Sequence, residues 1–307
     1  MRLSSHYMFQ RSITSMSEAM DKNNAIYTSL SAGKKLLKPS DDPAGASQAL
    51  VYRGALASLD QYDTARMYAE DALGQEDNTL SSIGNILTKN LTEKIVAGGN
   101  GAYSDADRQA LAKELEGIRS TLKDLANSKN SNGRYIFSGY KTGTQPFSDE
   151  GTYQGGDTAI SQKVGDSTEM QIGHTGKDVF MSGTADDVFA ALDKSIAALN
   201  NPVGSDEERA ALQDALDSAN VSIKHAIDNM GKIQANVGTN LQQIDMLNSS
   251  AATQRIQTQT RLDETTGADP NSWTQMVSES KMSDFAMTAS MTVFQAMQKM
   301  SLFSLLS

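Results

Sequence analysis

Apolar residues recur every three or four positions over most of the chain, a spacing that predicts long helices. The longest such pattern follows Ser205, where Asp206, Glu207 and Glu208 form a capping box with acids at the positive end of the helix dipole. Two heptad rows then continue for about six repeats, a length that favours close packing against other helices. The rows are Leu216, Ile223, Met230, Val237, Ile244 and Ala251, and Leu212, Ala219, Ala226, Ile233, Asn240 and Leu247.

Four further helices follow from the same spacing. They are expected at about 4–38, 43–97, 105–126 and 188–199. Ser104 to Asp107 resembles a capping box with Asp in place of Glu, and Asp42 followed by Pro43 is a good helix start. A last helix is expected from Pro270 toward Phe303, after a break at 265–270. The chain is therefore predicted to be mainly helical.

The segment from Gly133 to Gly183 has a different pattern. It holds ten of the 23 glycines, which separate short apolar or β-branched runs, and Tyr135–Phe137 has the composition of a strand. We predict a β-rich insert here. The expected domains are an N-terminal assembly helix (1–42), two parts of a helical bundle (43–136 and 204–268), the β-rich insert (137–203) and a C-terminal assembly helix (269–307).

The two terminal helices carry the candidate functional residues. Each bears an apolar stripe, and Asn23 and Lys34 interrupt the first one, where a buried Asn lowers stability but fixes register. An ordinary intramolecular helix pair and binding to a membrane surface are alternatives, although the last helix lacks the basic polar face that the second requires. Self-assembly through the paired terminal helices is the favoured interpretation. The predicted assembly residues are Ile13, Met16, Met20, Tyr27, Leu30, Met282, Ala286, Ala289, Val293, Ala296, Met300 and Phe303.

Composition and charge narrow the function classes. The 27 basic and 37 acidic residues give a net charge of -10, which argues against a nucleic-acid partner. There is no cysteine, and His6, His174 and His225 are far apart, so neither a metal nor another cofactor is expected. No run is apolar enough for membrane insertion or for a cleaved export signal, so we expect a chain that is either cytoplasmic or exported without a cleaved signal.

Catalytic motifs are weak. Ser31 to Lys34, Ser120 to Lys123 and Ser278 to Lys281 each match S-x-x-K, and Lys141-Thr142-Gly143 imitates a second element of the serine β-lactamases. The Ser-Asp-Asn element of those enzymes is missing from the sequence. We interpret the matches as chance and expect no enzyme activity, with a serine acyl-enzyme as the distant alternative.

Several motifs together resemble the bacterial flagellin superfamily. They are Met1–Ser4 with Met8-Phe9, Leu30–Lys34 followed by Pro39–Gly45, Asn132–Gly139 with Thr142 and Pro146-Phe147, and Met300–Leu306. The stretch at 132–139 is more similar to the superfamily's hook–filament junction proteins than to its flagellins, and flagellin remains the near alternative.

The order of the elements predicts an elongated rod in which the two terminal helices lie side by side and the small β domain lies at the tip. The insert is expected to be dispensable for the core, because it enters and leaves between two helices whose ends can be bridged. The resemblance implies a flagellin-like arrangement in which the terminal helices form a coiled coil and the long helices form a bundle. It also implies a structural protein exported through the flagellar type III apparatus, located at the hook–filament junction and self-assembling into a ring. The implied partners are the first junction protein, flagellin and a cytoplasmic export chaperone.

Overall fold

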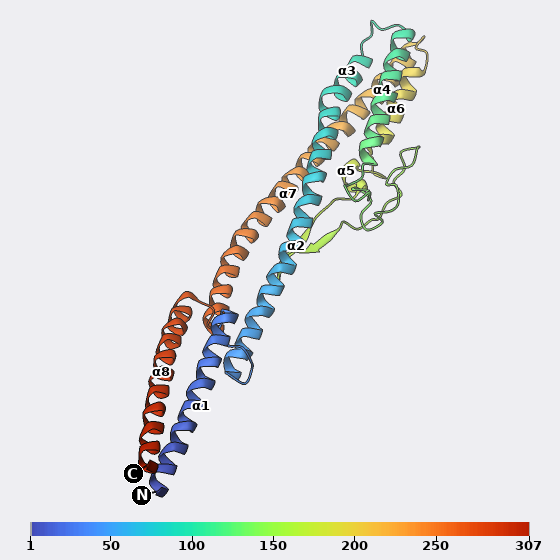
Figure 1. Ribbon diagram of the computed structural model, residues 1–307. Helices are drawn as coiled ribbons and strands as arrows, with labels where there is room; N and C mark the ends of the chain where they lie inside the picture. Colours follow the sequence, from blue (N-terminus) through green and yellow to red (C-terminus); the bar gives the residue numbers. More distant parts are fainter. Residues whose placement is uncertain (1, 307) are drawn as a thin grey trace. The chain divides into compact units, whose positions relative to one another are not determined.

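The computed structural model describes residues 2–306, with side chains from residue 7 to 296 and at residue 298. It confirms a mainly helical fold with one small sheet (Figure 1). The chain forms two compact units, one that combines the segment up to Asp60 with the segment from Ala251 onward, and one that spans Gln61–Ser250. The elements are α1 (Arg2–Ala32), α2 (Pro43–Asn85), the π-helix η1 (Ile86–Leu91), α3 (Thr92–Gly98), α4 (Asp105–Ala126), β1 (Ser161–Lys163), β2 (Glu169–Gln171), α5 (Gly176–Phe180), α6 (Val188–Asn200), α7 (Asp206–Thr266) and α8 (Pro270–Leu306).

The unit that spans 61–250 is organised around α7. The predicted heptad rows of this helix are its buried face, as Leu216, Ile223, Val237 and Ile244 show, with at most 2% of each exposed. They pack in one continuous core with the apolar residues of α2, η1, α3, α4 and α6. The rows predicted from spacing alone are therefore confirmed for this helix.

The single helix predicted over 43–97 contains a π-helical turn. Its buried residues step by four from Ile83 to Leu87, Leu91 and Ile95, and repeated steps of four would rotate the buried face of an α-helix with 3.6 residues per turn. The i→i+5 bonding of a π-turn takes up the extra residue. Leu87, Leu91 and Ile95 consequently all remain in the core, each with at most 2% exposed.

The insert is largely irregular. β1 and β2 pair antiparallel, with Gln162 opposite Met170, whereas the predicted strand at Tyr135–Phe137 is wrong because Tyr135 forms only an isolated bridge with Lys129. The insert also belongs to the core. Four of its aromatic rings pack at centroid distances of 5.0–6.2 Å and are at most 1% exposed, at Phe137, Phe147, Phe180 and Phe189. The expectation of a dispensable appendage is therefore wrong.

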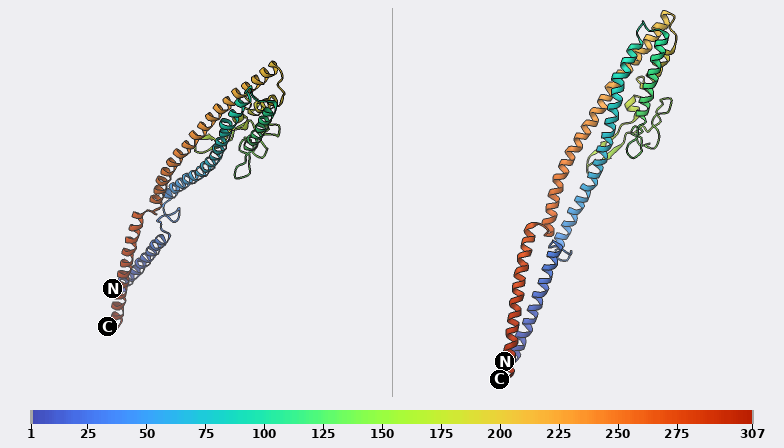
Figure 2. Two further views of the ribbon diagram at one scale, coloured as in Figure 1. Left: turned by 90° about the horizontal axis from the view of Figure 1, so that it is seen from above. Right: turned by 45° about the horizontal axis from the view of Figure 1, so that its top comes forward.

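The position of the sheet also differs from the prediction. Tyr62 donates to Asp166 over 3.4 Å, and the buried Arg66 donates to the carbonyl oxygen of Val164 over 3.2 Å, so the hairpin lies beside the middle of α2. The other end of this unit consists of the α3–α4 and α6–α7 connections (Figures 1 and 2). The hairpin therefore does not form the tip of the unit.

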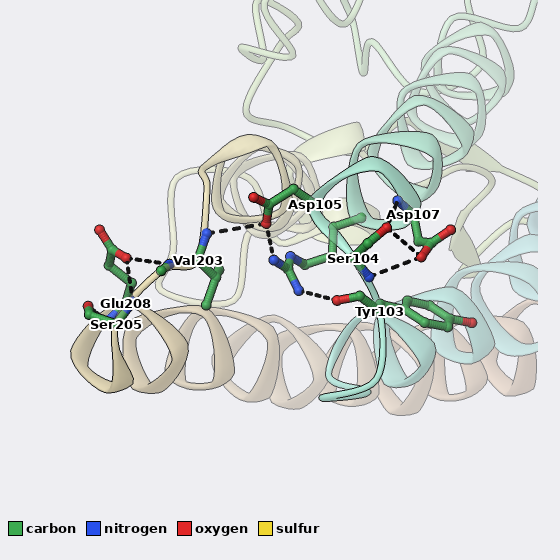
Figure 3. A network of polar contacts seen from close by, with 9 residues as sticks. Tyr103, Ser104, Asp105, Asp107, Val203, Ser205 and Glu208 are labelled. Atoms are coloured by element: carbon green, nitrogen blue, oxygen red, sulfur yellow. Dashed lines mark hydrogen bonds and ion pairs between the residues drawn. The ribbon is translucent and has the colours of Figure 1, made fainter.

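Polar contacts join those two connections (Figure 3). Asp105 accepts hydrogen bonds from the Arg108 guanidinium and from the backbone N–H of Val203, 3.3 Å away. The predicted capping box is present on α4, where the Asp107 backbone N–H donates to the Ser104 hydroxyl and the Asp107 carboxylate accepts from the Ser104 backbone N–H. The Ser104 hydroxyl and the Ser104 backbone N–H both donate to the Asp107 carboxylate, and these two bonds hold the pKa of Asp107 below its usual value. The loops that close the bundle are thus fixed by helix caps.

The other unit contains α1, α8 and the segments next to them. α1 and α8 lie side by side in every view (Figures 1 and 2). α1 ends at Ala32 instead of the expected 38, because Gly33 adopts a φ of +66° that stops the helix. A hydrogen bond from the Ser272 side chain lowers the pKa of Asp269, as do the bonds that its carboxylate accepts from the backbone N–H groups of Ser272 and Asn271 at the start of α8.

A hinge joins the two terminal helices to the rest of this unit. The backbone N–H groups of Lys35 and Leu36 both donate to the carbonyl oxygen of Thr266, each over 2.9 Å. Gly267, with a φ of +67°, follows directly, and a Cβ there would lie 2.5 Å from the Cβ of Lys35. The hinge therefore depends on a glycine at position 267.

Candidate assembly surface

The contact between α1 and α8 is made by one face of each helix, with steps of four and three along both. On α1 the half-buried or buried positions are Ser12, Met16, Ala19, Asn23, Ile26 and Leu30. On α8 they include Met276, Ser280, Ser283, Met287, Ser290 and Phe294. Phe294 stacks on Phe9 with a centroid distance of 5.4 Å. We call these two faces the seam, and much of it is small or polar.

The stripe predicted on α1 divides between the seam and the surface. Met16 and Leu30 lie in the seam, whereas Ile13, Met20 and Tyr27 are exposed by 42%, 51% and 49%. The structure therefore places only part of this stripe against α8.

The stripe predicted on α8 faces outward. Met282 and Val293 are 69% and 52% exposed, and Ala286, Ala289 and Ala296 are exposed as well. Met300 and Phe303 lie outside the residues whose side chains are described. We call the exposed residues of both stripes, from Ile13 to Tyr27 on α1 and from Met282 to Ala296 on α8, the outward rows.

The outward rows have the character of an interface. Between Asp284 and Lys299 the sequence of α8 has no charged residue, although most of this stretch is exposed. Phe285, beside the outward row of α8, is 76% exposed, and Met291, on another face of the helix, is 47% exposed. Contiguous exposed apolar surface of this kind marks interaction sites in soluble proteins. The arrangement therefore offers packing surface for further helices.

One polar cluster lies in the seam and at its edge, where the half-exposed Tyr27 reaches a carboxylate of α8. The Asn23 side chain, 5% exposed, donates through Nδ2 to Asp284 Oδ1 over 2.9 Å, and the Tyr27 hydroxyl donates to Asp284 Oδ2, also over 2.9 Å. Sequence reasoning placed Asn23 in the helix seam but missed Asp284 and the seam serines. The signal that could have found them is the spacing of Ser280, Ser283 and Ser290 among Met276, Met287 and Phe294.

The residues of the weak catalytic motifs have other contacts. The Lys123 ammonium pairs with Asp149 over 2.8 Å, and that of Lys141 donates to the carbonyl oxygen of Gly155. Of the histidines with described side chains, His174 pairs with the buried Glu76 and His225 pairs with Asp186, both over 3.0 Å. Across the side chains that the structure describes, no group of three or more His, Asp or Glu could hold a metal ion.

None of the helices in the described part of the chain is long and apolar enough to cross a bilayer.

Comparisons with known proteins agree on one family. Residues 3–142 match the model of the bacterial flagellin N-terminal helical region. The chain is 37% identical to flagellar hook-associated protein 3 of Escherichia coli (strain K12) and 36% identical to that of Salmonella typhimurium, each over 99% of both chains. The crystal structure of flagellar hook-associated protein-3 from Legionella pneumophila has a TM-score of 0.65 at 20% identity and covers 71% of this chain and 99% of that one.

Flagellins match over less of the chain. The flagellin of Listeria monocytogenes is 28% identical over 130 residues, which is 41% of this chain and 45% of the flagellin. The full-length similarity therefore lies with the hook-associated proteins, and the similarity to flagellin is distant and partial.

Proposed function

The chain belongs to the family of flagellar hook-associated protein 3, also named FlgL, and from this premise we propose that its outward rows join neighbouring subunits at the junction between hook and filament. It is a structural protein of the bacterial flagellum and assembles with other flagellar components. Within that role, the ring of subunits, its position between hook-associated protein 1 and flagellin, and the chaperone that holds the chain before export are our proposals.

The observation that carries the proposal is the exposure of the outward rows. Ala289, Val293 and their neighbours face away from α1, and a helix that is apolar on two faces needs more than one packing partner. Alanine side chains also allow close approach of a second helix. Other copies of the chain in a ring supply such partners, since each subunit would present both outward rows.

Two further proposals rest on the family alone. We propose export through the flagellar apparatus without a cleaved signal, as the resemblance to the flagellin superfamily implies. We also propose that assembly is the chain's whole role, without catalysis, because its full-length relatives are structural flagellar proteins. Covalent labelling of a serine by a fluorophosphonate probe in the purified protein would contradict the second proposal.

The experiment for the outward rows replaces Ala289 by Glu. If the row becomes dry on assembly, an unpaired carboxylate there costs several kcal/mol in every subunit of the ring. Cells with Ala289→Glu should therefore secrete flagellin into the medium instead of building filaments, and the monomer should melt within a few degrees of wild type because the site is exposed.

The matched control is Gln295→Glu, which adds the same charge at an exposed position beside the row. This variant should build normal filaments. Normal filaments in Ala289→Glu would remove the row from the subunit contacts, and a far lower melting temperature of the monomer would place the row in the folded core.

A further inference from the structure

Large apolar side chains lie both in the seam and outside it. Met16 and Phe294 are half-buried in the seam, whereas Met20 and Met282 face outward. Because hydrophobic stabilisation follows the apolar area removed from water, burial alone does not specify which of these faces pair. Another interaction must select the observed faces.

The polar cluster in the seam has the properties of such a selector. Asp284 accepts from two α1 side chains, one on each carboxylate oxygen, so both bonds require this face of α8 to meet this face of α1. The second contact of the Asn23 amide nitrogen is a long one, 3.8 Å to Met287 Sδ. Asn23 Oδ1 is buried and has no hydrogen-bond partner in the described part of the chain.

This incomplete hydrogen bonding indicates that Asn23 makes the pairing of the two helices specific and does not make it more stable. A buried amide with one oxygen unbonded is expected to cost free energy compared with an apolar side chain. A polar residue in a helix seam can nevertheless specify register, since every other arrangement loses its partner.

We propose that Asn23, Tyr27 and Asp284 determine which faces of α1 and α8 pair, and thereby keep the outward rows on the surface. Rotating α8 would carry the Asp284 carboxylate away from both donors, so the polar cluster favours the observed faces over other pairings. The benefit to assembly rests on the proposed function, but the selection of faces does not.

The oxidation rates of the chain's own methionines can show which faces of α1 and α8 are paired. Met20 and Met282 are 51% and 69% exposed, whereas Met16 and Met287 are half-buried in the seam. Mild peroxide converts accessible methionine to the sulfoxide, and mass spectrometry of peptides gives the rate at each position. In the purified full-length wild type, Met20 and Met282 should oxidise several-fold faster than Met16 and Met287.

The test variant is Asn23→Ser combined with Asp284→Ser, which removes the hydrogen bonds between the helices without making the seam more apolar. The order of rates should then be lost, with Met20 and Met282 no longer faster than Met16 and Met287, because neither pair of faces is then selected. The matched control is Asn24→Ser with Lys281→Ser, two exposed neighbours outside the seam. It should keep the wild-type order.

Two outcomes would overturn the proposal. One is an unchanged order of rates in the Asn23→Ser, Asp284→Ser variant, and the other is equal rates at all four methionines in the wild type. Neither outcome depends on where the protein is located on the flagellum, so failure of this inference is distinguishable from failure of the proposed function.

Discussion

Replacing Gly267 by Ala should open the hinge between the terminal helices and the rest of their unit. An L-residue in the left-handed conformation costs roughly 1–2 kcal/mol. The new methyl group would also lie 2.5 Å from Lys35 Cβ and 3.2 Å from the Lys35 nitrogen, so the backbone must shift. That shift weakens the two bonds from Lys35 and Leu36 to the Thr266 oxygen, each worth about 1 kcal/mol.

Gly33 provides the matched control. Its φ of +66° is nearly the same, but a Cβ there would meet no described atom within 4 Å, so Gly33→Ala carries the backbone strain alone. We expect a loss of about 1–2 kcal/mol for Gly33→Ala and about 2–4 kcal/mol for Gly267→Ala. The loss expected for Gly267→Ala should accelerate amide hydrogen exchange by a factor on the order of 30 to 1,000 wherever exchange requires opening of the hinge.

The assay is hydrogen–deuterium exchange of the Lys35 and Leu36 amides in the full-length protein. Gly267→Ala should accelerate exchange at both amides well beyond Gly33→Ala. Equal acceleration in the two variants would show that the close approach to Lys35 contributes nothing, and unchanged exchange in both would refute the structural role of the hinge.

Three further predictions concern the unit that spans 61–250. The pKa of Asp107 is lower in the folded chain than in the unfolded chain. The contribution of this carboxylate to stability is therefore present above its unfolded pKa and is lost as the pH falls through its folded pKa. Asp107→Asn should flatten the fall of the melting temperature between about pH 5 and pH 2. Replacing 140–200 by a Gly/Ser linker should abolish cooperative melting, measured by circular dichroism, because it removes buried aromatic residues from the core. His174→Ala removes the imidazole that contacts the fully buried Glu76 and leaves that side chain only the His174 backbone N–H, so it should cost about 1–3 kcal/mol in urea unfolding, whereas His174→Ala with Glu76→Leu should recover most of that loss.

Features determined by local chemistry could be predicted from the sequence. The Ser104–Asp107 capping box depends on residues three apart, and the structure has it as expected. The buried rows of α7 follow from helical spacing, which the length of the pattern averages over several turns. The division at Gly267 to Pro270 follows from residues that end and begin helices.

Features determined by distant contacts could not be predicted in this way. Tyr135 and Ile136 have strand composition, but their N–H groups donate to Thr142 and Ser128 in irregular loops, so the segment lacks a neighbouring strand. The faces of α1 and α8 were missed because counting apolar residues selects Met20 and Met282, which are 51% and 69% exposed in the structure. Apolar spacing alone does not tell whether such a residue packs within the chain.

Immunogold labelling of isolated flagella tests the central claim most directly. A protein of the hook–filament junction should give one band of label where the hook meets the filament, and none along the filament itself. Label distributed over the whole filament would make the chain a flagellin-type subunit, and its absence from the junction would contradict the account.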